Sequence, residues 1–307
     1  MEAAPLITVL TPTYNRAHLL GRVYESLLAQ TFPRFEWIIV DDGSEDDTQT
    51  LVRSWIDEGK LEILYRRQAN SGKFAAVNRG AELARGEYTT TVDSDDWLVP
   101  DALERLLAHW RAIPDAEQQD FSGIVGLCAY EDGRIVGDAF PYDPLDCDPA
   151  ELTYVYGVAG DKHSLLRTAV LREFPFPFEG ASDPPRLVWN RMALKYRERH
   201  VNEVVKIVEY QPGGLTDDAL KLQIRTPLPM RQFFLEELRL PHRLPLRRRL
   251  RSYANYTRFS LHARLGVREQ AREAPSTATW VLIAPLGTIL YIRDRLRFAE
   301  PSSLLIG

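Results

Sequence analysis

The sequence predicts an α/β fold in which a mostly parallel, Rossmann-like sheet carries helices on both faces. Short β-type runs alternate with helical patterns between residues 6 and 113, and this alternation is typical of parallel strands joined by crossover helices. Polar residues follow the β-type runs, at the edge where such sheets bind their ligands. After residue 214 the β-type runs stop and helical patterns continue. We therefore expect two parts, residues 1–214 and 215–307.

The spacing of apolar residues predicts the individual elements. Apolar or β-branched runs predict strands over residues 6–12, 35–43, 61–67, 87–93 and 201–211. Apolar residues at helical spacing predict helices over residues 17–30, 46–59, 71–86, 100–113 and 187–198. Residues 123–137 are expected to form a hairpin that turns at Asp132 and Gly133. In the second part we expect helices over residues 230–240, 244–266 and 277–298.

The two parts differ in charge. Residues 1–214 contain 35 acidic and 22 basic side chains, whereas residues 215–307 contain 8 acidic and 16 basic side chains. An acidic part joined to a basic part indicates that each has its own partners. The two cysteines, Cys128 and Cys147, form no CxxC pair, so we expect a reducing, cytoplasmic location and no structural zinc site.

Asp93, Asp95 and Asp96 place three carboxylates in one turn, within the stretch VDSDDW. This crowding has two explanations: a solvated turn that caps the following helix, or a divalent cation bound between the carboxylates. Mg²⁺ typically takes one or two protein carboxylates and completes its coordination with water and substrate phosphates. The neighbouring strand ends favour the second explanation, with Mg²⁺ or Mn²⁺ as the cofactor.

Two neighbouring strand ends carry groups that suit a nucleotide. Thr11 and Tyr14 end the first strand, where a hydroxyl or a ring can flank a base. Asp41 and Asp42 end the second strand, where a carboxylate can accept a hydrogen bond from a base or a ribose hydroxyl. A metal site beside such groups predicts binding of a nucleoside diphosphate.

The third helix begins with two cations that can balance phosphate charge, Lys73 and Arg79; a solvated helix face is the alternative for both. Other nucleotide-binding folds fit poorly. The stretch TPTYNRAHL after the first strand is not a G-x-G-x-x-G loop, and no G-x-x-x-x-G-K-[ST] segment occurs. Dinucleotide-binding folds and P-loop NTPases are therefore disfavoured.

Four stretches resemble the successive signatures of glycosyltransferase family 2, in its bacterial family A type: ITVLTPTYNRAHLL, FEWIIVDDGSEDDT, NSGKFAAVNRGAELARGEY and VDSDDW. The resemblance is dense over about residues 5–113 and extends to about residue 216. It implies a GT-A fold and the inverting transfer of a sugar from a nucleotide-diphosphate donor, usually a UDP-sugar. The acceptor would be a glycan or a lipid-linked glycan of the bacterial surface. Residues 1–113 would form the nucleotide-sugar half and residues 114–214 the acceptor-side half.

The resemblance also implies roles for the site residues. The D-x-D element of the family falls on Asp93 and Asp95, with Asp96 alongside. One of these carboxylates would contact the ribose or sugar and another the metal, and Asp95 is our preferred metal ligand. The complete set of candidates for nucleotide-sugar binding is Thr11, Tyr14, Asp41, Asp42, Lys73, Asp93 and Asp161.

The sequence departs from the family where the catalytic base is expected. Proteins of this subgroup usually present an acid just before the LVWNR helix, whereas this chain has Pro185 there, in FEGASDPPRLVWNR. Asp183 is our preferred base for the proton of the acceptor hydroxyl, and Glu179 is the alternative. A turn aspartate before a proline pair is the other explanation of Asp183. We expect Asp161 to bind the sugar or the acceptor.

The second part combines many arginines with an apolar, aromatic stretch, TWVLIAPLGTILYIRDRLR. A basic amphipathic segment that is too short to span a bilayer suits a membrane interface. We therefore expect a peripheral contact with the inner membrane face. The alternative is a helix packed on the catalytic domain with a solvated basic face. No nucleic-acid motif accompanies the charge, so nucleic acid is not an expected partner.

Two other functions agree with parts of the pattern. A non-catalytic homologue that still binds a nucleotide sugar is supported by the proline at position 185, but not by the intact acid cluster. A sugar-1-phosphate nucleotidyltransferase would need a glycine-rich, basic loop after the first strand, and TPTYNRAHLL is not such a loop.

Overall fold

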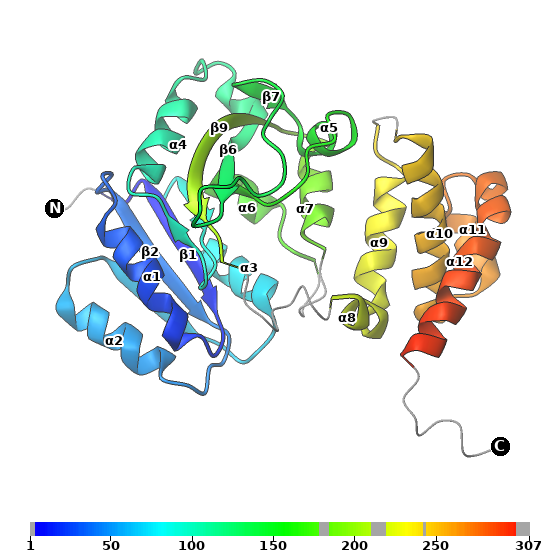
Figure 1. Cartoon of the computed structure of the whole chain (residues 1–307), viewed down its shortest axis with the longest axis horizontal. Coiled ribbons are helices and arrows are strands. Elements are labelled where there is room, and N and C mark those ends of the chain that lie inside the picture. The colour runs from blue at the N-terminus through cyan, green and yellow to red at the C-terminus, as the bar shows by residue number, and fades with distance from the viewer. Residues whose placement is uncertain (1–3, 178–183, 210–218, 242–243, 299–307) are drawn as a thin grey trace. The chain divides into compact units, whose positions relative to one another are not determined.

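The computed structural model describes residues 4–177, 184–209, 219–241 and 244–298. The contacts divide the chain into two compact units. One unit comprises Met1–Ala181 with Arg191–Pro212, and the other comprises Ser182–Asn190 with Gly213–Gly307. All strands described below lie in the first unit, and the long C-terminal helices lie in the second (Figure 1).

One mixed sheet organises the first unit. Its strands are β1 Ile7–Thr13, β2 Phe35–Asp41, β3 Ile63–Arg67, β4 Tyr88–Thr91, β5 Trp97–Leu98, β6 Phe121–Ala129, β7 Leu145–Cys147, β8 Lys162–Arg167 and β9 Arg197–Ile207. They lie in the order β3-β2-β1-β4-β8-β6-β9-β5, and β7 pairs with β9. The pairs among β3, β2, β1 and β4 are parallel, as the alternating pattern predicted. The strands β5, β7 and β8 join antiparallel.

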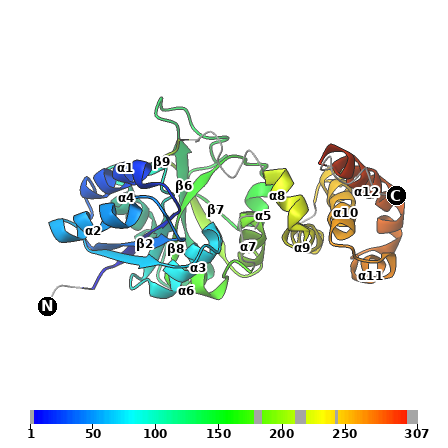
Figure 2. The same ribbon diagram turned by 90° about the horizontal axis from the view of Figure 1, so that it is seen from below.

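Helices cover both faces of this sheet. The helices of the chain are α1 Ala17–Leu28, α2 Thr48–Glu58, α3 Lys73–Leu83, α4 Ala102–Arg111, α5 Pro149–Tyr154, α6 Thr168–Glu173, α7 Pro185–Met192, α8 Ala219–Arg225, α9 Pro227–Glu237, α10 Leu246–His262, α11 Val267–Glu273 and α12 Thr277–Arg297. In the first unit, α1, α2 and α4 lie on one face of the sheet, and α3 and α6 lie on the other (Figure 2).

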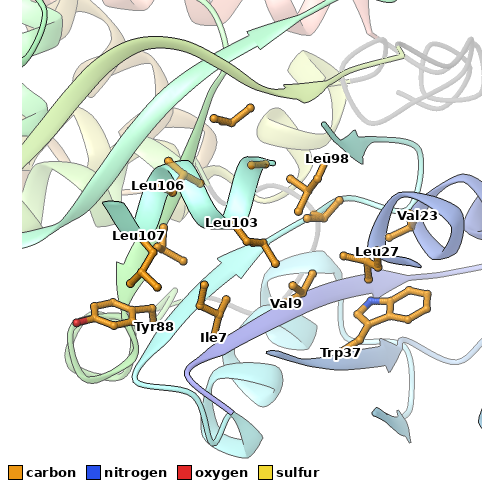
Figure 3. Packing of buried hydrophobic residues seen from close by; sticks show 14 of the residues in the cluster. Ile7, Val9, Val23, Leu27, Trp37, Tyr88, Leu98, Leu103, Leu106 and Leu107 are labelled. Carbon is orange, nitrogen blue, oxygen red and sulfur yellow. The ribbon is translucent and has the colours of Figure 1, made fainter. Parts of the chain in front are cut away.

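The core of the first unit follows from the alternation of β1, because successive strand residues face opposite sides of a sheet. Ile7 and Val9 are fully buried on the side of α1, α2 and α4 (Figure 3). Three aromatic rings extend this layer. Tyr24 of α1 stacks on Trp55 of α2 with ring centroids 4.5 Å apart, and Trp37 of β2 lies 5.8 Å from Trp55. The layer fixes the parallel strands whose carboxyl ends carry the candidate site.

The irregular middle of the chain differs from the sequence prediction. The hairpin turn forms, since Gly133 has φ +83° and its N–H donates to the carbonyl of Tyr130 at 2.9 Å, but the returning strand is reduced to a single bridge between Ala129 and Ile135. The predicted helix over residues 187–198 ends at Met192, because Arg197 already pairs with β6 as the start of β9.

The second unit confirms the three predicted C-terminal helices as α9, α10 and α12, each with shifted ends. α10 lies between α9 and α12 and packs against both, and α11 packs against α12. Among the residues that the structure describes, no helix is both long and apolar enough to cross a membrane.

The close approach of α3 to β1 depends on Gly80. A Cβ atom at this position would lie 2.0 Å from Cδ1 of Leu10, which is fully buried. We expect Gly80→Ala to lower the free energy of unfolding by about 1–3 kcal/mol, the usual effect of overpacking. Gly21→Ala in α1 is the matched control, because its Cβ would meet nothing within 4 Å. The control should gain up to about 1 kcal/mol from helix propensity. Urea unfolding measures both, and equal effects would contradict the packing argument.

Candidate active site

The three aspartates of the acid cluster lie in the turn between β4 and β5, at the carboxyl end of β4. One carboxylate oxygen from each of Asp93, Asp95 and Asp96 lies within 4.8 Å of the others. The turn is closed by the N–H of Asp96, which donates to the carbonyl of Asp93 at 3.1 Å. Because β4 is parallel to β1 and β1 to β2, the carboxyl ends of all three strands share this edge.

Each carboxylate of the acid cluster pairs with a cation from a different part of the first unit. The pairs are Asp93 with Lys73 at the start of α3 (2.7 Å), Asp95 with Arg16 just before α1, and Asp96 with Lys206 of β9 (2.5 Å). The side chains of Asp93 and Asp95 are 30% and 17% exposed, whereas that of Asp96 is 9% exposed. The cluster therefore has two accessible pairs above one buried pair.

The cations set the ionisation of these carboxylates. Burial alone would raise the pKa of Asp93, but the charges of Lys73 and Lys206 outweigh it and hold that pKa at about 2. Burial raises the pKa of Asp96 to about 6 against the attraction of Lys206. The pKa of Lys206 rises above its usual range, because the carboxylates of Asp96 and Asp93 outweigh the effect of its burial. At neutral pH all of these groups are charged.

His163 of β8 lies below the acid cluster and is not part of its charge balance. Its Nε2 lies 2.7 Å from the hydroxyl of Thr90, and its side chain is buried. Burial, together with the positive charge of Lys206, lowers the pKa of His163 to about 3. The imidazole is therefore neutral, and its hydrogen bond to Thr90 holds the end of β4, from which the turn begins.

Asp41 is fully buried at the end of β2, with both carboxylate oxygens engaged. Oδ1 accepts a hydrogen bond from the N–H of Ser44 at 2.7 Å, and Oδ2 accepts one from the hydroxyl of Tyr65. Burial and this carboxylate raise the pKa of Tyr65 well above its usual value. Arg67 Nε lies 4.0 Å from Oδ2. Asp41 is thus held in one position at the same edge as the acid cluster.

Asp42 holds the segment that leads into α3. Its Oδ1 accepts hydrogen bonds from Gln68 Nε2 at 2.8 Å and from the N–H of Ser71 at 2.9 Å. Its Oδ2 accepts a hydrogen bond from the N–H of Gly72 at 2.7 Å. Since Lys73 is the next residue, Asp42 positions the cation that pairs with Asp93. The structure thus gives this carboxylate a positioning contact.

The two candidates at the end of β1 differ in exposure. Thr11 is fully buried, and its hydroxyl accepts a hydrogen bond from Trp37 Nε1 at 3.0 Å. The structure therefore gives Thr11 a contact with the core, whereas Tyr14 is 47% exposed. The N–H of Asn15, which has φ +52°, donates a hydrogen bond to Ser44 Oγ at 2.9 Å and so connects the ends of β1 and β2.

The remaining candidates divide by position. Asp161 is exposed just before β8, and antiparallel pairing places this end of β8 at the carboxyl end of β4. Arg79 pairs with Glu82 at 2.6 Å on the exposed side of α3, which agrees with the solvated-face explanation. Asp183 and Glu179 lie outside the described residues.

Sequence reasoning missed two of the three cations of the acid cluster, Arg16 and Lys206. A signal for Lys206 was present, because it is a lone cation within the apolar strand segment EVVKIV. A charge in such a strand needs a partner when it is buried. The sequence does not say which acid that partner is.

The donor set of the acid cluster fits a hard divalent cation. It offers carboxylate oxygens alone, and Mg²⁺ and Mn²⁺ prefer oxygen ligands. Asp93 and Asp95 are the ligands that a cation could reach, because their present partners are partly exposed side chains. Asp96 is less accessible to a cation, because it is buried and paired with Lys206.

Solved glycosyltransferases share this fold. TarS of S. aureus, solved in complex with UDP-GlcNAc, matches with a TM-score of 0.60 and 21% identity over 95% of this chain and 85% of the TarS chain. The mannosyltransferase PcManGT of Pyrobaculum calidifontis, solved with GDP-Man and Mn²⁺, matches with a TM-score of 0.54 and 19% identity over 98% of this chain and 82% of that chain. The chain therefore has the GT-A fold, and its C-terminal helices follow that fold.

Sequence comparison identifies the family. Residues 8–120 match the family model of Glycosyl transferase family 2. The putative teichuronic acid biosynthesis glycosyltransferase TuaG of Bacillus subtilis is 39% identical over 105 residues, which is 34% of this chain and 41% of TuaG. The chain spans less than half the length of the curated relatives that it matches first. Residues 8–120 therefore carry a domain of the glycosyltransferase family 2 type.

The depressed pKa of Asp93 predicts a pH-dependent stability in metal-free buffer. Because the folded-state pKa of about 2 lies below the ordinary 3.8, the ionised carboxylate stabilises the fold above about pH 4, and this stabilisation disappears as the pH falls towards 2. We expect Asp93→Asn to lower the free energy of unfolding by about 1 kcal/mol at pH 6, because the pair with Lys73 is partly exposed, and the difference from wild type to shrink below pH 4. Urea unfolding at several pH values measures it, with the exposed Asp57→Asn as control. A difference independent of pH would contradict the charge balance.

Proposed function

We propose that the chain is a metal-dependent, inverting glycosyltransferase that acts in the cytoplasm. In this proposal it transfers a sugar from a UDP-sugar to a glycan or lipid-linked acceptor during synthesis of a bacterial surface polysaccharide. The observation that supports it most is the cation-balanced acid cluster at the shared edge of the parallel strands. The family, the likeness to TarS with its UDP-GlcNAc and the match to TuaG support the donor and the pathway class.

The acid cluster suits a metal and a diphosphate bound together. Asp95 and Asp93 would hold Mg²⁺ or Mn²⁺, and such an ion supplies stabilisation of the negative charge that develops on the leaving diphosphate. With a metal held by these carboxylates, Arg16 and Lys73 would be released from Asp95 and Asp93 and could pair with phosphate oxygens. Asp96 stays paired with Lys206 and keeps the turn in place.

Recognition of the nucleoside is assigned to the neighbouring strand ends. The ring of Tyr14 is exposed and can therefore stack on a base. Such stacking does not depend on which base is bound. Asp41 is assigned a hydrogen bond from a base N–H; since its side chain is fully buried, this contact requires the hydroxyl of Tyr65 to move away from Oδ2. Thr11 supports this edge from the core through Trp37, and Asp42 supports it by placing Lys73.

The transfer step requires a base on the acceptor side. The acceptor hydroxyl oxygen attacks the anomeric carbon as the bond from that carbon to the diphosphate oxygen breaks, and attack from the opposite face inverts the configuration. The hydroxyl proton passes to a carboxylate within hydrogen-bond reach. We assign this role to Asp183, with Glu179 as the alternative, and assign sugar or acceptor binding to Asp161.

Donor turnover tests the metal assignment. With a panel of UDP- and GDP-sugars and Mn²⁺ or Mg²⁺, we expect hydrolysis by the wild type and a loss of about a hundredfold or more in Asp95→Asn. Asp57→Asn, an exposed carboxylate on α2, is the matched control and should retain full activity. Turnover in EDTA equal to that with metal, or an active Asp95→Asn, would contradict the metal assignment. Nucleotide-sugar binding without turnover of any donor would instead favour a non-catalytic homologue.

The base assignment has its own test. We expect Asp183→Asn to lower kcat by about 10²–10⁴ while KM for the donor stays close to that of wild type, because a base acts on the acceptor proton and not on donor binding. Glu179→Gln is the comparison variant. Full activity of Asp183→Asn together with an inactive Glu179→Gln would exchange the two roles.

A further inference from the structure

Helix α12 of the second unit exposes an apolar face. Its exposed aliphatic side chains are between 49% and 78% accessible. From Leu282 onward they recur at intervals of three or four residues, with Val281 beside the first of them, and therefore lie on one side of the helix. We call this set the α12 apolar face; its members are Val281, Leu282, Leu286, Ile289, Ile292 and Leu296. In the described part of the chain, α12 packs against α10 and α11 through its other side.

The opposite side of α12 is the one that is buried, and it carries polar groups. Asp294 is 1% exposed, and its carboxylate accepts hydrogen bonds from both Nε and Nη2 of Arg258, the latter at 2.8 Å. His262 Nε2 lies 3.1 Å from the same carboxylate. Removing one partner of a buried pair of this kind would leave an uncompensated charge in the interior. The helix is therefore fixed with its charged residue inward and its aliphatic residues outward.

Two further contacts fix the same orientation. Trp280 is buried, and its Nε1 donates a hydrogen bond to the hydroxyl of Thr257 at 3.0 Å. At Gly287 a Cβ atom would lie 2.4 Å from the carbonyl oxygen of Ala254, so α10 and α12 touch backbone to backbone there. Trp280 is therefore not part of the exposed surface of α12. The aliphatic residues form the exposed apolar surface instead.

Positive charge adjoins the α12 apolar face. Arg293, Arg295 and Arg297 are exposed in its last two turns, and Arg293 is 58% exposed beside Ile292. The part of the chain that contains these helices has 16 basic and 8 acidic residues. An aliphatic surface bordered by arginines is complementary to a lipid surface with anionic headgroups.

We propose that the α12 apolar face docks on an anionic lipid surface, with the helix lying in the plane of the interface. A single aliphatic side suits this position, because the other side carries Asp294 and its partners and cannot face lipid. A second copy of the chain is the less favourable occupant, since a two-fold contact through this face would bring the arginines of both copies together. The inference does not rest on the transfer reaction.

Vesicle co-sedimentation of the full chain tests the proposal without any donor. The probes are vesicles of phosphatidylcholine alone and of phosphatidylcholine mixed with phosphatidylglycerol. We expect binding to the anionic vesicles that weakens with salt, and a partition coefficient about tenfold or more lower in Leu282→Gln/Ile289→Gln. The matched control, Leu194→Gln/Leu228→Gln, removes two exposed leucines elsewhere and should bind like wild type.

Circular dichroism keeps the test falsifiable, since only variants with wild-type helix content are compared. If Arg293→Gln/Arg297→Gln binds anionic vesicles more weakly than wild type, but binds phosphatidylcholine vesicles equally, the attraction between these arginines and anionic headgroups is supported. Equal binding of wild type and Leu282→Gln/Ile289→Gln would overturn the proposal. A wild-type dimer that this double variant converts to a monomer, without vesicle binding, would assign the face to a second copy. Donor turnover is measured separately, so a failure of either proposal leaves the other one standing.

Discussion

Charge balance at the carboxyl ends of the parallel strands is the constraint on which the site depends. Three carboxylates in one turn would repel each other, and the fold supplies one cation for each from α3, from the entry of α1 and from β9. The pair between Asp96 and Lys206 joins residues 110 positions apart. The acid cluster therefore connects the turn after β4 with β9, which lies much later in the chain.

The three pairs differ in what it costs to open them. Breaking the buried Asp96–Lys206 pair would leave an unpaired charge in the interior, at about 3–5 kcal/mol. The pairs of Asp93 and Asp95 are partly exposed, and such pairs typically contribute only about 0–1 kcal/mol. A metal and a diphosphate can therefore replace the outer two pairs while the inner pair keeps the turn in position. The difference in burial between the inner pair and the outer pairs would allow one cluster both to hold the turn and to bind a ligand.

The sequence predicted what depends on local spacing, including the polar strand ends and the order of strands and helices up to residue 113, except for the two-residue strand β5. It also predicted the aspartates that the structure brings together. Partner choice was not predictable, because Lys206 reaches Asp96 only through the pairing of β5 with β9. The hydrogen bond between Thr11 and the buried Trp37 was missed for the same reason, since Trp37 is on another strand. In α12 the usual rule that apolar residues face inward failed. Asp294 is buried because it pairs with Arg258, and the aliphatic residues of the helix are exposed.

The most direct measurement is an anomalous difference map from a crystal grown with UDP and Mn²⁺. We predict one manganese peak within coordination distance of a carboxylate oxygen of Asp95, with Asp93 at the ion or at the ribose, while Lys206 remains paired with Asp96. Arg16 and Lys73 should have left Asp95 and Asp93 for the diphosphate. Manganese bound elsewhere, or UDP bound while Arg16 and Lys73 keep their carboxylate partners, would contradict the exchange of the outer pairs for a metal and a diphosphate.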